Sequence, residues 1–462
     1  MWKTNSVKQL LGFLVIVLLA GATRITIAAP AEDRVVVMIS VDGLAAYYID
    51  DPKADMPTLR QLAAEGARAE SMKAVTPTVT WPNHTTLVTG DYPARHGVVG
   101  NNYYDREAGK KMVLISDPVF DKDQIVKVPT IYDAAKAAGM KTAAIRWPAT
   151  RNAASLDWTL PDVREEAQFE KYTTPALLSE CEAAGIHLIK DSPTAKFDPD
   201  QSKDETFTQA FNLILAKHHP RLALLHVIDV DHTEHLKGPR SEGAYKAVHE
   251  ADGYVREVWE ELKKDYPGRA TLIVVSDHGF SPINKMILPN VVLAKEGLVE
   301  SGKKKADSAV QIVTQGGAVF MYIRDEAHRK EVMAKIHKAF HGLEGVSKIV
   351  DSEDFKKWGV ADPKDDPHAP DMILFAEEGY SFGDTAGGAL PFNEKPERKG
   401  SHGHDPSIPD LHATFVAWGA GIKPGVKLGE IKNIDVAPTI AELLNLEFSG
   451  TDGKPLEKIL AK

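Results

Sequence analysis

The stretch "RVVVMISVDG" (Arg34–Gly43) decides the fold, because it holds an almost wholly apolar run that ends in an acid and a glycine. An apolar run without polar alternation is typical of a strand that is buried on both faces of a parallel sheet. In doubly wound folds, ligands bind at the carboxyl ends of such strands. We therefore expect an α/β fold in which Asp42 lies at the ligand-binding edge of the sheet.

Four further runs have the character of buried strands, and amphipathic helical patterns lie between them. The runs are "KTAAIRW" (141–147), "RLALLHVIDV" (221–230), "ATLIVVSD" (270–277) and "ATFVAWG" (413–419), and helices are expected near 56–67 and 130–140. Strands that alternate with helices predict a doubly wound, mostly parallel sheet.

The regular alternation of strand and helix patterns is interrupted in residues 285–395. This part has a lysine-rich loop, "SGKKKADS", and a polar loop, "VADPKDDPHAPD", around strand-like and helical segments. We interpret this part as a small inserted α+β subdomain. The main domain then consists of 32–284 and 396–462.

The N-terminus has the pattern of a secretory signal peptide, which we place at residues 1–28. Lys3 and Lys8 precede an apolar run, and the uncharged stretch from Gln9 to Thr23 is shorter than the ~20 apolar residues of a spanning helix. An uncleaved anchor is the alternative. The single cysteine, Cys181, allows no intramolecular disulfide and lies too far from this segment for lipoprotein attachment. We expect an exported protein of bacterial type, periplasmic or secreted, without a stable membrane span after cleavage.

The charge pattern argues against a nucleic-acid polymer as partner. Formal net charge is −10, and no Lys/Arg-rich run is long enough to line a polyanion groove. A small phosphate compound remains compatible, because local metals or arginines can outweigh the global field. Nothing in the sequence predicts the oligomeric state.

Metal-type ligands follow several of the predicted strands. The ligands are Asp42, Asp231 with His235 four residues later, the adjacent pair Asp277 and His278, and His402 in "KGSHGHD". Each alone is ordinary, because an aspartate after a strand is usually a turn residue or helix cap. Together, three aspartates and three histidines suffice for two three-ligand sites, the pattern of a two-metal phosphotransfer centre. Such a donor set suits Zn²⁺ or a similar divalent ion.

The segment "TVTWPNHTTLVTG" (78–90) supplies a candidate nucleophile. Pro82 fits the first position of a helix and Gly90 its end, which places Thr80 just before a helix N-terminus that favours phosphate. A threonine hydroxyl beside a metal could attack phosphorus. The alternative is that Thr80 or Asn83 only caps the helix.

Assembled in this order, these motifs resemble the nucleotide pyrophosphatase/phosphodiesterase family of the alkaline phosphatase superfamily. The matching segments are "TWPNH", "TGDYPARHG", the Asp231 to Pro239 stretch, the Asp277 to Gly279 triplet, the Gly400 to Gly403 stretch and the closing "NIDVAPTIAELLNL". The resemblance implies an alkaline phosphatase-like fold and hydrolysis of small phosphodiesters or nucleotides.

Carried over by position, the resemblance implies two Zn²⁺ ions. One would be held by Asp231, His235 and His402, and the other by Asp42, Asp277 and His278. Thr80 would be the nucleophile beside both ions and would form a phosphothreonine intermediate. Asn101, with Asn102 as the weaker alternative, and the backbone N–H near Trp81 would hold the phosphoryl oxygen.

Two positions depart from the family pattern, and both concern the substrate more than the mechanism. Trp81 stands where phenylalanine is common, and its ring could stack on a base or an apolar leaving group. The family's Trp-Pro-Gly appears as Trp147 to Ala149.

Three other functions stay open. A phosphomonoesterase of the same superfamily would need cations for a doubly charged phosphate, which Arg146 and Arg151 could provide. A phosphonoacetate-type hydrolase would use similar metals and a threonine. A non-catalytic zinc-dependent binding protein would have lost the nucleophile or a ligand, yet all seven positions are present. A sulfatase is disfavoured, because the sole cysteine lacks the C-x-P-x-R context.

Overall fold

The computed structural model describes residues 33–114, 120–163, 165–188, 203–300, 308–385, 387–388 and 390–461. Its largest sheet has eight strands in the order β18-β2-β17-β8-β1-β7-β5-β6. Only β17 runs antiparallel to its neighbours in this sheet. The expected α/β fold with a mostly parallel central sheet is confirmed, and the strand expected at 413–419 is its antiparallel member. The strands are β18 (Val426–Lys432), β2 (Ala67–Lys73), β17 (Phe415–Gly419), β8 (Ala270–Val275), β1 (Val35–Val41), β7 (Leu222–Val227), β5 (Thr142–Ile145) and β6 (Trp158–Leu160).

Strand β1 is apolar at every position except Ser40 because both of its faces are covered. Val35, Val37 and Ile39 belong to the core on one face of the sheet, while Val36 and Met38 belong to the core on the other face. Successive side chains of a strand point to opposite faces, so apolar residues occur at successive positions of the run and not only at alternate ones. Helices α1 (Pro57–Glu65), α7 (Pro175–Ala183), α8 (Asp204–His218) and α10 (Glu242–Asp265) cover the first face, and α2 (Thr80–Thr89), α5 (Ile131–Ala137) and α14 (Val436–Leu444) cover the second.

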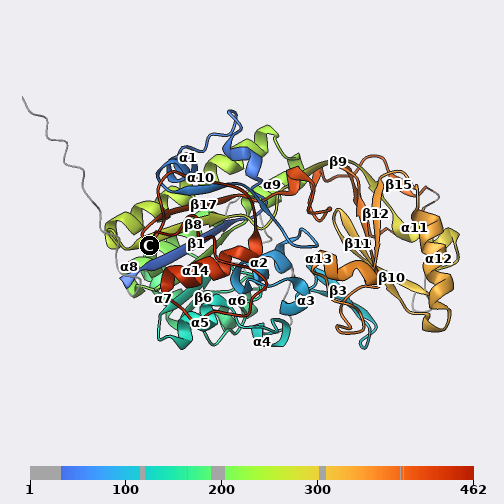
Figure 1. Cartoon of the computed structure of the whole chain (residues 1–462), viewed down its shortest axis with the longest axis horizontal. Helices are drawn as coiled ribbons and strands as arrows, with labels where there is room; N and C mark the ends of the chain where they lie inside the picture. The colour runs from blue at the N-terminus through green and yellow to red at the C-terminus, as the bar shows by residue number, and fades with distance from the viewer. Residues whose placement is uncertain are drawn as a thin grey trace, which may run out of the picture.

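A second, four-stranded sheet forms a lobe beside the central sheet (Figure 1). It has the order β10 (Val310–Gln315), β11 (Ala318–Ile323), β13 (Met372–Ala376) and β12 (Val346–Asp351), with α11 (Pro289–Lys295), α12 (Arg329–Phe340) and α13 (Phe355–Trp358). These elements lie inside 285–395. Strand β9 (Ser281–Ile287) crosses the expected boundary at 285 and pairs with β16 (Gly400–Ser401), which lies beyond 395. The domain bounds therefore remain predictions.

The other elements are short. Strands β14 (Gly379–Phe382) and β15 (Phe392–Asn393) pair with β9, and β3 (Asn102–Asp105) forms a hairpin with β4 (Lys110–Val113). The remaining α-helices are α3 (Pro93–His96), α4 (Lys122–Ile125), α6 (Glu166–Tyr172) and α9 (Asp229–Lys237). Short 3₁₀ turns lie at Ala46–Ile49, Glu326–His328, Ser352–Asp354, Pro409–Leu411 and Asn433–Asp435.

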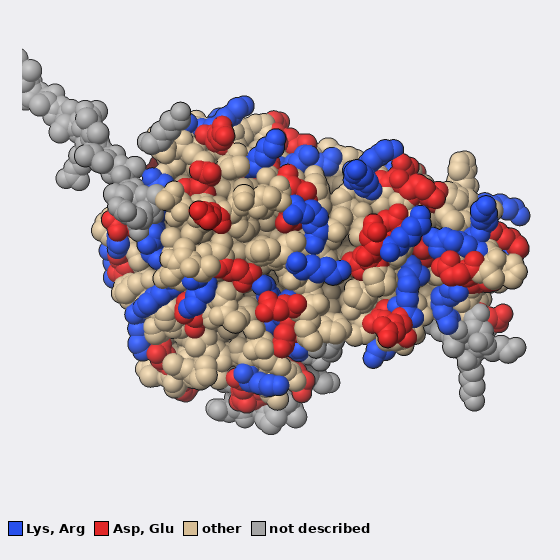
Figure 2. All heavy atoms as spheres, turned by 60° about the horizontal axis from the view of Figure 1, so that its bottom comes forward, with Lys and Arg blue, Asp and Glu red and all other residues tan. Residues whose placement is uncertain are grey.

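The surface mixes charges of both signs. On the face shown in Figure 2, basic and acidic side chains are interspersed over both lobes, unlike the continuous basic surface that a polyanion requires. Within the described ranges no helix is both long and apolar enough to cross a membrane. The predicted signal peptide, residues 1–28, lies outside the described residues.

His96, at the end of α3, yields a prediction about the stability of the fold. Its Nδ1 accepts the Val98 N–H at 3.1 Å and its Nε2 lies 3.0 Å from Thr86 Oγ1, a hydroxyl that itself donates to the Asp91 carbonyl. This pattern holds the imidazole neutral, and burial lowers the pKa of His96 to about 3. The unfolded chain takes up this proton near pH 6.5. The contribution of His96 to stability is therefore complete above pH 6.5 and is lost as pH falls toward 3.

We expect the His96→Gln variant to lose stability less steeply than the wild type when pH is lowered from 6.5 to 4.5. The difference should be about 1.4 kcal/mol per pH unit, since one proton separates the two slopes. Urea unfolding at three pH values, compared between the two proteins, measures it. Parallel stability profiles would show that His96 is not held neutral.

Candidate active site

Three segments meet at the carboxyl end of the central sheet. Asp42 follows β1, and its backbone N–H donates to the Val227 carbonyl at the end of β7 at 2.8 Å. The Asp231 N–H donates to the Asp42 carbonyl at 3.1 Å, and the Gly43 N–H donates to Asp277 Oδ1 at 3.2 Å. Backbone hydrogen bonds thus fix the three aspartates relative to one another before any ligand is bound.

The end of β7 differs from the prediction. The strand was expected to continue to residue 230, but it stops at Val227, and α9 begins at Asp229. Asp231 and His235 therefore lie one turn apart on a helix. Residues at i and i+4 share a helix face, which brings both side chains to the same side.

The first group consists of Asp231, His235 and His402. Asp231 Oδ1 lies 3.5 Å from His235 Nε2 and 3.4 Å from His402 Nε2. The two Nε2 atoms are 3.2 Å apart. Three ligand atoms at mutual distances of this size surround a common point, as the ligands of one metal ion do.

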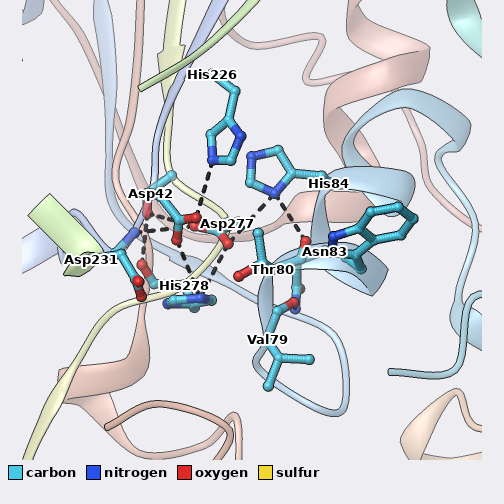
Figure 3. A network of polar contacts seen from close by, with 12 residues as sticks. Asp42, Val79, Thr80, Asn83, His84, His226, Asp231, Asp277 and His278 are labelled. Atoms are coloured by element: carbon cyan, nitrogen blue, oxygen red, sulfur yellow. Dashed lines mark hydrogen bonds and ion pairs between the residues drawn. The ribbon is translucent and has the colours of Figure 1, made fainter. Parts of the chain in front are cut away.

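The second group consists of Asp42, Asp277 and His278, and Figure 3 shows it beside Thr80. His278 Nε2 lies 3.5 Å from Asp42 Oδ1 and 3.1 Å from Asp277 Oδ2. The two groups adjoin, because the rings of His278 and His402 stack with centroids 3.8 Å apart. Asp231, His278 and His402 also satisfy the distances of a ligand set, so the division of six ligands between two ions remains a prediction.

The donor atoms of the site fit divalent cations. Four of these atoms are buried and have no hydrogen-bond partner among the residues that the structure describes: Asp42 Oδ1, Asp231 Oδ1, Asp277 Oδ2 and His278 Nε2. Buried polar atoms without partners are costly, and several that converge on one place are the arrangement expected of a metal-binding site. The aspartate and imidazole set is one that zinc favours.

Backbone carbonyls select the tautomer of the three candidate ligand histidines. The Nδ1 atoms of His235, His278 and His402 lie 3.1, 3.1 and 3.0 Å from the carbonyl oxygens of Gly400, Gly279 and Thr78. Each Nδ1 must carry the hydrogen to donate to its carbonyl, which leaves each Nε2 with a free lone pair. This arrangement orients a metal-binding imidazole.

Burial sets the charge of the site. It lowers the pKa of His235 and His402 to about 3, so both imidazoles are neutral near pH 7. Burial, and then the charge of Asp231, raise the pKa of Asp277 to about 7, and burial raises the pKa of Asp42 well above its usual value. Buried carboxylates this close repel one another, and a divalent cation between them would reverse these shifts.

Thr80 is the first residue of α2, which corrects the expected helix start. Val79 is the N-cap and offers no side-chain hydrogen bond, and Pro82 lies two residues inside the helix. Gly90 ends the helix with a φ of 71°, as expected. In Figure 3 the Thr80 hydroxyl faces Asp277 and His278.

Asn83 does not cap the helix either, because its side chain holds the loop in front of it. Its Oδ1 accepts the Val75 N–H, and its Nδ2 donates to the carbonyls of Pro77 and Val79. The loop that carries Thr80 toward the ligands is thereby fixed from within the helix. Neither capping alternative for Thr80 or Asn83 agrees with this geometry.

Asn101 lies beside the start of α2, and Trp81 points away from the site. Asn101 Oδ1 accepts the Trp81 N–H at 2.8 Å, so this backbone donor already has a partner. The Trp81 side chain is 1% exposed and packs with Val98, Val99 and Tyr103. The expected stacking of its ring on a substrate, and the use of its N–H as an oxyanion donor, do not agree with this placement.

Two buried histidines that the sequence did not point to border the second group. His226 Nε2 lies 3.0 Å from Asp42 Oδ2. His84 Nδ1 lies 2.9 Å from the Thr80 carbonyl and 3.5 Å from Asp277 Oδ2. A histidine inside the apolar run "RLALLHVIDV" is unusual for a strand buried on both faces, and this signal could have identified His226.

The two arginines considered for a phosphate monoester have acidic partners. Arg146 Nη1 lies 2.6 Å from Asp204 Oδ1, and Arg151 Nε lies 3.0 Å from Asp121 Oδ1. Arg146 and Arg151 therefore hold structural carboxylates.

A family model described as Type I phosphodiesterase / nucleotide pyrophosphatase matches residues 36–405. Ectonucleotide pyrophosphatase/phosphodiesterase family member 1 of Homo sapiens is 26% identical over 431 residues, which cover 90% of this chain and 40% of the human protein. The venom phosphodiesterase of Naja atra is 24% identical over 437 residues, with coverages of 90% and 45%. The chain thus spans less than half the length of these two animal relatives.

Solved structures show the same fold. Murine ectonucleotide pyrophosphatase / phosphodiesterase 5 superposes with a TM-score of 0.69 at 19% identity, covering 93% of this chain and all of that one. An inactive threonine-to-alanine variant of the murine protein, in complex with AMP, gives 0.70 at 19% identity with the same coverages.

Proposed function

Because the chain belongs to the type I phosphodiesterase / nucleotide pyrophosphatase family, we propose that it hydrolyses small phosphodiesters, with two zinc ions and Thr80 as the nucleophile. The observation that carries this proposal is the convergence of buried, unpartnered ligand atoms from two adjoining groups beside the start of α2. Nucleotides and dinucleotide pyrophosphates are included in the proposed substrate class.

Six residues would hold the two ions. They are Asp231, His235 and His402 for one ion, and Asp42, Asp277 and His278 for the other. When bound, the ions would lower the pKa of nearby hydroxyl groups and stabilise negative charge on the attacking and leaving oxygens. Hydrogen bonds fix the tautomers of the ligand histidines and the backbone at the ligand aspartates, so these side chains are positioned before a metal ion binds.

Thr80 supplies the oxygen that attacks phosphorus. The hydroxyl gives its proton to water, Oγ1 bonds to phosphorus, the bond to the leaving oxygen breaks, and that oxygen takes up a proton from water to leave as an alcohol or phosphate. Water then attacks phosphorus and loses a proton, the bond to Oγ1 breaks, and Oγ1 takes up a proton, which releases the phosphomonoester and restores Thr80. Thr80 lies at the N-terminal end of α2, where the positive end of the helix dipole favours the negative charge of the phosphoryl group.

Asn101 would bind a phosphoryl oxygen through its amide nitrogen. Its Oδ1 accepts the Trp81 N–H, so its orientation is fixed and Nδ2 is the group left to donate. A donor set in place before the reaction costs no reorganisation at the transition state.

We expect the enzyme to prefer diesters to monoesters. A monoester carries one more negative charge, and Arg146 and Arg151, which could balance it, are paired with Asp204 and Asp121. The value of kcat/KM for a p-nitrophenyl phosphodiester should exceed that for p-nitrophenyl phosphate by at least about tenfold, or ~1.4 kcal/mol. A higher value for the monoester would favour the phosphomonoesterase, and activity on phosphonoacetate alone would favour the C–P hydrolase.

Zinc content and turnover together test the proposed function. The purified protein is expected to bind two zinc ions and to lose phosphodiester hydrolysis when a chelator removes them. Two bound zinc ions without hydrolysis of any phosphoester would instead indicate a binding protein. Export remains part of the proposal and rests on the N-terminal signal pattern.

A further inference from the structure

The imidazole of His226 lies between two oxygen atoms, one on the side chain of Asp42 and one on the backbone of Arg146. His226 is the β7 residue paired with Ser40 of β1, two residues before Asp42. Its Nε2 lies 3.0 Å from Asp42 Oδ2, and its Nδ1 lies 3.0 Å from the carbonyl oxygen of Arg146. The side chain is 1% exposed, so water does not compete for either contact.

The two oxygens of Asp42 have different surroundings. Oδ2 faces His226, whereas Oδ1 has no hydrogen-bond partner and lies 3.5 Å from His278 Nε2. An aspartate that binds a metal is a carboxylate and can only accept hydrogen bonds. In the metal-bound protein both ring nitrogens of His226 therefore face acceptors and both carry hydrogen. The Nδ1–H donates to the Arg146 carbonyl, and the Nε2–H donates to Oδ2.

We propose that His226 is a positioning residue, whose hydrogen bond to Oδ2 turns Oδ1 of Asp42 toward the second metal ion. This inference rests on the proposed two-zinc site. A free carboxylate can rotate or bind through both oxygens, and a fixed donor on one oxygen leaves the other as the ligand. Partners of this kind are worth roughly 10–100-fold in metal affinity.

The imidazole of His226 is itself held in place from two sides. Arg146, whose carbonyl faces Nδ1, has a φ of 54°, a left-handed conformation that is uncommon for residues other than glycine. The Arg146 guanidinium pairs with Asp204 at 2.6 Å. The ring of His84 packs against His226 with centroids 4.2 Å apart. The ring therefore has one orientation, and that orientation aims Nε2 at Asp42.

Two amide variants test the contacts of the two imidazole nitrogens separately. The His226→Gln side chain places its NH₂ group near the position of Nε2 and can still donate to Asp42. The His226→Asn side chain is shorter, and its NH₂ group lies near the position of Nδ1, where it reaches only the Arg146 carbonyl. Both replace the ring by a neutral amide, so a role in packing alone predicts similar behaviour.

The test is a competition titration of zinc against a chromophoric chelator with the full chain. We expect His226→Asn to bind one of its two zinc equivalents about 10–100-fold more weakly than the wild type, and His226→Gln to stay within about threefold. Equal affinities in all three proteins, or equal losses in both variants, would overturn the proposal. A wild type that binds no zinc would refute the proposed function instead, which keeps the two failures distinct.

A second test of this proposal uses only the wild-type protein, so it does not depend on whether the variants fold. Long-range ¹H–¹⁵N correlation spectra of the zinc-loaded protein with labelled histidine report which ring nitrogens carry hydrogen. We expect a protonated Nε2 on His226, in contrast to bare Nε2 atoms on His235, His278 and His402. A bare Nε2 on His226 would contradict the proposed donation.

Discussion

The Thr80→Ala variant is expected to lose phosphodiester turnover by roughly 10⁴-fold or more, the scale of removing a nucleophile from a covalent mechanism. Thr80 lies at the start of α2 with its hydroxyl toward Asp277 and His278. Its methyl and hydroxyl are small, so alanine leaves the helix intact. The two zinc ions should remain bound, because the six proposed ligands are unchanged.

Thr85 offers a matched control on the same helix. Its hydroxyl is buried and donates to the Trp81 carbonyl at 2.9 Å, away from the ligand groups. Thr85→Ala should therefore keep turnover within a few-fold, and Thr80→Ser should restore most of the activity that Thr80→Ala loses. Steady-state rates on a p-nitrophenyl phosphodiester measure all three variants. Turnover that survives in Thr80→Ala would show that the nucleophile is another group.

The Asp277→Asn variant is expected to lose one zinc equivalent and about 10³-fold in turnover, since a metal ion supplies several kcal/mol of charge stabilisation. Asp277 is fully buried, and its Oδ2 lies 3.1 Å from His278 Nε2 without a hydrogen-bond partner. An amide at this position keeps the shape of the side chain but removes its negative charge. Zinc content after dialysis and the steady-state rate are the measurements.

Asp366 is the control for this substitution. It is also a buried aspartate, but it lies in the second lobe and pairs with Lys127 at 2.9 Å. Asp366→Asn should keep both zinc equivalents and full turnover. If Asp277→Asn kept them as well, Asp277 would not be a ligand.

The sequence predicted those features that depend on local patterns and on the edge of a parallel sheet. Continuous apolar runs such as 34–41 require burial on both faces, and the residues that follow parallel strands must meet at one edge. The structure brings the six predicted ligands to that edge. Their roles, and that of Thr80, remain predictions that the variants above can test.

The features that the sequence missed depend on contacts between distant segments. The pairing of His226 with Asp42 joins residues 184 positions apart and follows from the register of β1 against β7. Trp81 is buried because Val98, Val99 and Tyr103 fold back over it. The antiparallel direction of β17 is likewise a property of the connections and not of its own residues.

The start of α2 shows a competition between local rules. Pro82 is favoured at the first helical position, yet the helix begins two residues earlier, at Thr80. The Asn101 side chain accepts the Trp81 N–H and Pro82 has no N–H, so the first turn does not need a capping side chain at Val79. Tertiary hydrogen bonds thus override the preference of a single residue.

The stereochemical outcome at phosphorus tests the central claim, a covalent intermediate on Thr80, most directly. Each in-line displacement inverts phosphorus, so two successive displacements retain its configuration, whereas direct attack by water inverts it. We predict net retention when a phosphodiester made chiral at phosphorus is hydrolysed in isotopically labelled water by the zinc-loaded wild type. Net inversion would contradict the account, because it would show that Thr80 never bonds to phosphorus.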